Sequence, residues 1–202
     1  MGSCVATGFE AYARVFPSLC VSEEKRLSWA ELAAINGRVA HPLMELHLIA
    51  SAAPGREPSP WNGNIGGVLP EAELRELAEL LRSFTRAPNR CWYSVWSGYG
   101  GIEETETGAK FSTLSGEREY ILSFGPIEDA TSFEFGTGPD IWWPADRAWC
   151  VGGDTDLAAT YVGGSASCIQ ALLDSSALEA LPVSVSDRVD IYADLINDAG
   201  VY

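Results

Sequence analysis

Residues 91–96 carry the sequence CWYSVW, and this short stretch decides the fold class. Its aromatic and β-branched side chains are typical of a β-strand. Two other stretches have the same character, REYILSF at 118–124 and AWCV at 148–151, and each is bounded by Gly, Pro or Asp. We therefore predict that these three segments are strands of one sheet.

Upstream of this cluster, two segments are predicted to be helices. SEEKRLSWAELAAINGR, residues 22–38, starts with Ser22 as a candidate N-cap and has acidic residues in its first turn. HPLMELHLIASAA, residues 41–53, has Pro42 near its first turn, a position that helices tolerate well.

The clearest helix is PEAELRELAELLRSF, residues 70–84, which has acids early and Arg82 late. Its apolar residues form one stripe at helical spacing: Leu74, Leu77, Leu81 and Phe84. A last helix is predicted within GGSASCIQALLDSSALEAL, residues 163–181, with Ser165 as its N-cap. Its apolar positions are Cys168, Ile169, Leu172 and Leu173.

Helices followed by a strand cluster and a final helix indicate an α+β fold, with helices packed on an antiparallel or mixed sheet. The length of 202 residues fits one domain, 1–202. Within it, the Pro- and Gly-rich segment 53–68 is predicted to be a surface loop. The polar segment 97–110 is predicted to be a mobile hairpin or loop.

Charge is distributed unevenly along the chain. The net charge is −15, and residues 101–202 hold eighteen acids and four bases, which gives −14. Such a field repels nucleic acid and anionic membranes and attracts basic partners. A general role in solubility is the alternative explanation.

The five cysteines are an odd number and contain no CxxC pair, so neither a disulfide framework nor a zinc site is expected. Cys91 and Cys150 lie in apolar runs and are predicted to be buried free thiols. Charges or prolines interrupt every apolar run before the roughly 18 residues of a membrane span, and no secretory signal is recognised. We therefore expect a cytoplasmic protein without a cofactor.

Catalytic candidates are few. His41 and His47 are six residues apart, which is not the spacing of a helical metal site, and we expect both to be structural. Asp154 and Asp156, in the sequence DTD, can hold a hard cation or share a proton. They leave open a metal-dependent hydrolase. The pattern does not continue into a calcium loop, because Ala158 follows.

Tryptophans offer a binding role instead. Trp142 and Trp143 are adjacent, so in a strand one faces inward and the other outward. Trp92 and Trp96 share one strand face and leave open a small-ligand pocket lined by tryptophan. An exposed tryptophan beside carboxylates is a typical binding anchor. We predict a contact surface consisting of Trp142, Trp143, Asp146, Arg147, Asp154 and Asp156.

The block WWPADRAWCV, followed by DTDLAATYVGGSASCIQALL, resembles a signature of a group of small uncharacterised actinobacterial proteins. The segments FEAYARVFP, WAELAAINGRVAHPLM and RCWYSVWSGYGG resemble the same group, so the likeness extends through most of the chain. It implies no activity, catalytic residue or cofactor. The layout also resembles that of acidic α+β immunity proteins, which neutralise bacterial toxins.

These observations favour a non-enzymatic protein-binding module, an immunity or antitoxin-like protein that holds a basic partner, such as a toxin, on an acidic surface. The alternatives are the hydrolase that uses Asp154 and Asp156 and the small-ligand binder with a Trp-lined pocket.

Overall fold

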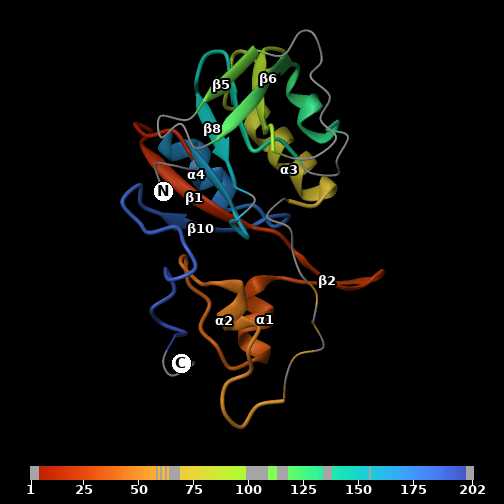
Figure 1. Cartoon of the computed structure of the whole chain (residues 1–202), viewed down its shortest axis with the longest axis vertical. Helices are drawn as coiled ribbons and strands as arrows, with labels where there is room; N and C mark the ends of the chain where they lie inside the picture. Colours follow the sequence, from red (N-terminus) through yellow and green to blue (C-terminus); the bar gives the residue numbers. More distant parts are fainter. Residues whose placement is uncertain are drawn as a thin grey trace.

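The CWYSVW stretch forms β4 (Cys91–Trp96), inside an eight-stranded sheet with the order β10-β1-β9-β8-β7-β4-β6-β5 (Figure 1). The computed structural model describes residues 5–198 except 58, 60, 62, 64–68, 99–108, 113–117, 134–137 and 155, and only the backbone of 109–112. The other strands are β1 (Ala11–Phe16), β5 (Ala109–Ser112), β6 (Glu119–Gly125), β7 (Ile141–Pro144), β8 (Trp149–Gly152), β9 (Thr160–Gly164) and β10 (Glu179–Val183). All neighbouring pairs are antiparallel.

This architecture confirms the predicted α+β domain with helices on an antiparallel sheet. The three predicted strands correspond to β4, β6 and β8, and only the ends of the last two are displaced, each by a single residue.

One face of the sheet is covered by α3 (Glu71–Arg82), the 3-10 helix η1 (Ile127–Thr131) and α4 (Ala166–Leu173). The predicted apolar stripe of α3 is buried there at Leu74, Leu77 and Leu81. In α4 the buried residues are Cys168, Ile169 and Leu172, and the side chain of Ser165 accepts the Cys168 N–H as the predicted N-cap. The strands contribute Ala13, Val15, Tyr93, Trp142, Trp149, Val151 and Val162 to this core.

The opposite face has a smaller apolar cluster to which no helix contributes. Its buried members are Val5, Tyr12, Cys150 and Tyr161, and Phe9, Ile141, Trp143, Leu157, Val183 and Val189 pack at its edge.

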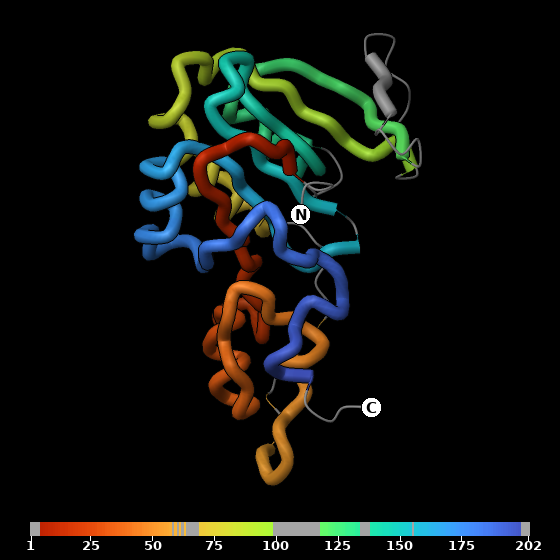
Figure 2. Tube along the Cα trace, turned by 90° about the vertical axis from the view of Figure 1, so that its left-hand side faces the viewer, coloured from red at the N-terminus to blue at the C-terminus, as the bar shows by residue number. Residues whose placement is uncertain are grey.

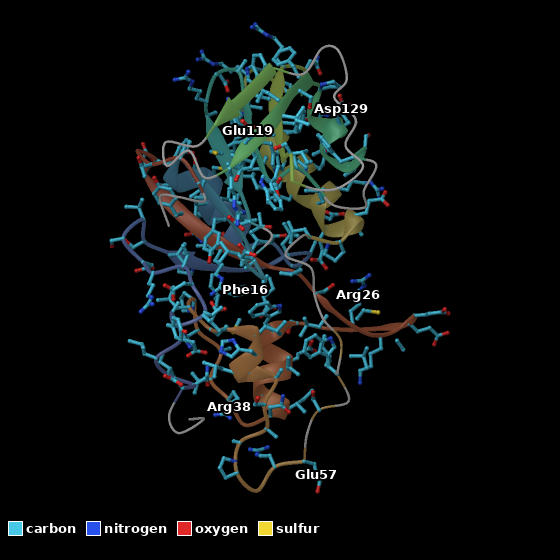
Figure 3. The ribbon with its side chains drawn as sticks, in the orientation of Figure 1. Phe16, Arg26, Arg38, Glu57, Glu119 and Asp129 are labelled. Atoms are coloured by element: carbon cyan, nitrogen blue, oxygen red, sulfur yellow. The ribbon has the colours of Figure 1, made fainter. Side chains whose placement is uncertain are left out.

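A third apolar cluster lies at one end of the sheet. It is formed by the hairpin β2 (Leu19–Ser22) and β3 (Lys25–Leu27), together with α1 (Trp29–Ile35) and α2 (Leu46–Ile49). Figures 1 and 2 both show α1 and α2 beyond the end of the sheet. Phe16, labelled in Figure 3, links the two parts because it ends β1 and packs against Trp29, with ring centroids 4.9 Å apart.

Arg14 also fastens this helical part to the sheet. Its guanidinium is buried and donates to the carbonyls of Pro42 and Met44 at 3.2 and 3.0 Å, and to Glu45 Oε1 at 3.0 Å. It lies 4.9 Å from the centroid of the Phe16 ring. Charge-assisted hydrogen bonds and aromatic contact together compensate for the burial of the cation.

The two upstream helices were predicted too long. Ser22 ends β2 and does not cap a helix; the N-cap is Ser28, whose side chain accepts the Glu31 N–H while Glu31 accepts the Ser28 N–H. This reciprocal capping box starts α1 seven residues after Ser22. Within 41–53, only Leu46–Ile49 is helical.

The prediction for 163–181 was correct only for its middle. Gly163 and Gly164 end β9, α4 stops at Leu173, and the residues from Glu179 onward form β10. The end of β9 and the start of β10 therefore belong to the sheet, with β1 between them.

The described residues of the predicted 53–68 loop, namely 53–57, 59, 61 and 63, contain no helix or strand. Of the predicted 97–110 loop, 99–108 lies outside the described residues, and 109 and 110 belong to β5. In the part of the chain that the structure describes, no helix has the length and apolarity needed to cross a membrane.

Candidate functional site

Asp154 and Asp156, the carboxylates of the DTD sequence, lie just after β8 and are bridged by one arginine. Arg118 donates from Nη1 to Asp154 Oδ1 at 2.7 Å and from Nη2 to Asp156 Oδ2 at 2.6 Å. Its guanidinium also lies 5.2 Å from the centroid of the Trp96 ring. Hydrogen bonding to Asp154 raises the pKa of Arg118, so this cation stays charged at any physiological pH.

The bridge changes what the two carboxylates can do. A hard divalent cation would have to displace a guanidinium that already supplies the compensating charge and the hydrogen bonds. No set of three or more His, Cys, Asp or Glu side chains among the described residues is arranged to hold a metal ion. The arrangement is that of an ion triad which ties the start of β6 to the end of β8.

Asp146 lies at the opposite end of the β7–β8 hairpin, in the turn, and has a structural role. It accepts the Thr85 hydroxyl and the Arg86 N–H, each at 2.8 Å, and so holds the segment after α3. Burial raises the pKa of Asp146, but these hydrogen bonds outweigh it and the net shift is downward. Arg147, next to it, is exposed and has a φ of 55°.

The adjacent tryptophans point to opposite faces of β7, as predicted. Trp142 is the inward residue: it is 1% exposed and packs edge-on against Trp149 at 4.9 Å between centroids. This burial removes Trp142 from the predicted contact surface, because no partner reaches it in this fold. Trp143 is half-buried on the face that α3 and α4 leave uncovered.

Trp143 belongs to an aromatic row that crosses three strands. Trp92 of β4 pairs with Trp143 of β7 on one side and with Phe124 of β6 on the other. The Trp92 and Phe124 rings lie 4.6 Å apart, and Phe124 is 48% exposed. We name these three residues the aromatic row. No local sequence pattern indicates this row, because it depends on which residues the paired strands place opposite one another.

The predicted contact residues therefore do not form one patch. Asp146 and Arg147 lie in the turn of the β7–β8 hairpin, whereas Asp154 and Asp156 follow its far end. The aromatic row crosses β7 at Trp143, between these two ends of the hairpin. Trp96, from the proposed Trp-lined pocket, lies on the same sheet face as Trp92 but stacks under Arg118.

His41 has the most enzyme-like contact in the described structure. Its Nε2 lies 2.8 Å from Asp194 Oδ1, and its Nδ1 accepts the Leu43 N–H at 3.3 Å. Both ring nitrogens are therefore occupied, and none of the described hydrogen bonds of His41 involves a hydroxyl or thiol that it would activate. This pair joins the C-terminal segment to the loop before α2.

Three of the thiols are poor nucleophiles in this fold. Cys91, Cys150 and Cys168 are buried, as predicted for the first two, and burial raises the pKa of each to about 11. A thiol with such a pKa is protonated at neutral pH and unreactive.

A surface cleft of about 260 Å³ lies between the β2–β3 hairpin, the start of α3 and the start of β10. Its lining includes Glu73 and Glu179. Both carboxylates already accept backbone N–H groups: Glu73 from Ser18, and Glu179 from Trp29 and Ala30 at the start of α1. Neither Trp92 nor Trp96 lines this cleft. Its two carboxylates stabilise the backbone at Ser18 and at the start of α1.

Comparison with protein-family models, curated proteins and solved structures gives no match for this chain. The resemblance to the actinobacterial group and to immunity proteins therefore stays a prediction.

Proposed function

We propose that this chain is a non-enzymatic protein-binding module that captures a basic partner, in the manner of an immunity or antitoxin-like protein. The observation that carries the proposal is the aromatic row on the sheet face that has no helical cover. Phe124 is largely exposed, and half-buried Trp and Phe side chains are frequent anchors of protein interfaces.

The charge of the chain supports a basic partner. The half of the sequence that includes β6, β7 and β8 carries a charge of −14. Arg118 pairs with both Asp154 and Asp156, which carry two negative charges against its single positive charge. A field of this sign speeds the approach of a basic protein and disfavours nucleic acid.

The described side chains support binding over catalysis. The thiols of Cys91, Cys150 and Cys168 are buried. The candidate base His41 is held by Asp194 and Leu43, and Asp154 and Asp156 share Arg118. Free thiols fit a reducing compartment, and we place the protein in the cytoplasm.

The test is affinity capture from extracts of the native cells with four forms of the chain: wild type, Phe124→Ala, Trp143→Ala and, as control, Ile35→Ala. Ile35 is exposed on α1, which lies beyond the end of the sheet. We expect the wild type and the control to recover the same basic protein, and both aromatic variants to recover much less of it. Phe124→Ala keeps the test valid if Trp143→Ala disturbs the fold, because Phe124 is 48% exposed.

Kinetics with the recovered protein complete the test. Association should slow as salt shortens the Debye length below about 8 Å, its value at physiological ionic strength. Loss of an aromatic anchor should instead speed dissociation. An equal yield with all four forms, or an association rate that ignores salt, would contradict the proposal.

A further inference from the structure

The C-terminal segment 190–197, with the sequence DIYADLIN, buries its polar side chains and exposes its apolar ones. Asp194 is 1% exposed and Asn197 is 3% exposed. The exposed fractions of the apolar residues are 54% for Ile191, 57% for Tyr192, 80% for Leu195 and 54% for Ile196. This inverts the ordinary rule of burial, and such inversions are the informative exceptions on a protein surface.

The inversion is enforced by a dense network of hydrogen bonds, so the apolar side chains are held outward. Asp194 accepts from the Glu45 N–H at 3.1 Å and the Asn197 N–H at 2.8 Å, besides its contact with His41. Asn197 in turn pairs with the backbone of Val39, at 2.9 Å to its N–H and 3.0 Å to its carbonyl. Figures 1 and 2 both show the C-terminal segment running alongside the loop before α2.

The hydrogen bonds of Asn197 also hold a fifth exposed apolar residue next to these four. Val39, which Asn197 holds, is itself 52% exposed. We call Val39, Ile191, Tyr192, Leu195 and Ile196 the C-terminal apolar surface. These five are the majority of the eight large hydrophobic residues that are exposed in the described part of the chain.

Charge decides what kind of partner fits this surface. Residues 187–198 hold four acids and one base, and Arg38, which donates to the Asn197 carbonyl, brings the net charge of this region to −2. One oxygen of Asp198 is buried with no hydrogen-bond partner in the described structure. A second copy of the chain would bring another net charge of −15 to the contact, so electrostatics oppose self-association and favour a basic protein.

We propose that the C-terminal apolar surface is a docking site for a protein segment that presents apolar side chains flanked by lysine or arginine, such as a basic amphipathic helix. This site is separate from the aromatic row: it lies on the 190–197 segment and the loop before α2, and it stands on the exposure and anchoring of its own residues.

The test uses the full chain and a fluorescein-labelled 18-residue helical peptide of Leu and Lys in an amphipathic pattern. Fluorescence anisotropy is measured for the wild type, for the double variant Tyr192→Ser/Leu195→Ser, for Phe124→Ser, which tests the aromatic row, and for Ile35→Ser as control. A second peptide has Glu at every Lys position. Thermal unfolding of each variant checks the fold, which these exposed substitutions should leave intact.

We expect the Lys peptide to bind the wild type, Phe124→Ser and Ile35→Ser with similar Kd values, and the double variant at least about tenfold more weakly. The Glu peptide should bind the wild type at least about tenfold more weakly than the Lys peptide. Equal affinity of the double variant, or equal affinity for both peptides, would overturn the proposal. So would a wild-type dimer in sedimentation velocity that the double variant loses, because the occupant would then be a second copy.

These experiments distinguish a failure of the proposed function from a failure of the proposed C-terminal docking site. A double variant that still captures the native basic partner, while Phe124→Ala does not, leaves the proposed function standing whatever the peptide shows. Loss of peptide binding in Phe124→Ser alone would assign the peptide to the aromatic row and overturn the C-terminal site.

Discussion

Gly163 in β9 occupies a position where any side chain would clash. A Cβ built there would lie 2.6 Å from Cδ2 of Phe9 and 2.8 Å from Cε1 of Tyr12, both of which cover this face of the sheet. We expect Gly163→Ala to lower the free energy of unfolding by about 1–3 kcal/mol, the usual cost of overpacking. Urea denaturation measures the change.

Gly164→Ala is the matched control, because its Cβ would meet the nearest atom, Cys168 Sγ, at 3.2 Å. Both substitutions reduce the freedom of the unfolded chain to the same degree, so their difference reports packing. Equal stability of the two variants would show that Phe9 and Tyr12 yield without cost.

Arg118 leads to a prediction about cations at Asp154 and Asp156. Because its guanidinium already binds both carboxylates, we expect millimolar Mg²⁺, Ca²⁺ or Mn²⁺ to leave the melting temperature of the wild type unchanged. Asp154→Ala/Asp156→Ala should respond in the same way. A wild-type melting temperature that rises with one cation, and no rise in the double variant, would favour the hydrolase alternative.

At the scale of elements, Asp194 is the residue that fastens the C-terminal segment to the helical part. Burial raises the pKa of Asp194, but hydrogen bonds from Asn197, Glu45 and His41 outweigh it, and the net shift is downward. A lowered pKa means that the ionised form stabilises the fold above the unfolded pKa of about 3.9, and that this stability is lost as pH falls through the folded pKa.

We therefore expect Asp194→Asn to lower the free energy of unfolding at pH 7 by about 2–4 kcal/mol, since it removes a buried charge with several donors. The deficit should shrink as the pH is lowered from about 4, where the unfolded chain is protonated first, through the folded pKa, where the folded wild type loses the same charge. Urea denaturation across this pH range is the measurement. Asp174→Asn, at an exposed helix end, is the control, and a deficit independent of pH would be inconsistent with the role of the charge.

Strands at the edge and in the interior of the sheet differ in how many neighbours they pair with. β10 pairs only with β1 among the described strands and contains Pro182, which lacks an N–H and is tolerated at an edge. β4 pairs on both sides, with β7 and β6. The aromatic row crosses β4 at Trp92, so the proposed contact face includes a strand that is paired on both sides.

At the scale of the whole molecule, hydrogen exchange should follow this pairing. We expect the amides of 91–96 to be among the slowest to exchange, because their hydrogen bonds open only with the sheet. The exposed turn at 191–192 should exchange much faster. Mass spectrometry of peptides from these segments measures both, and equal rates would contradict the interior position of β4.

The sequence by itself determined the features that depend on neighbouring residues. The stripe of α3, the Ser165 cap of α4 and the strand character of β4 all follow from patterns a few residues long. The opposite orientations of Trp142 and Trp143 follow from strand alternation alone. These local signals were sufficient for the α+β class, but they left an antiparallel and a mixed sheet open.

Only the tertiary structure decided the roles of the charged and aromatic side chains. Arg118 meets Asp154 across 36 residues, Asp146 meets Thr85 across 61, and His41 meets Asp194 across 153. Such contacts depend on strand register and on how the layers pack, and no local pattern encodes either. The outward apolar residues of 190–197 have the same origin, because their orientation is fixed by the distant hydrogen bonds that bury Asp194 and Asn197.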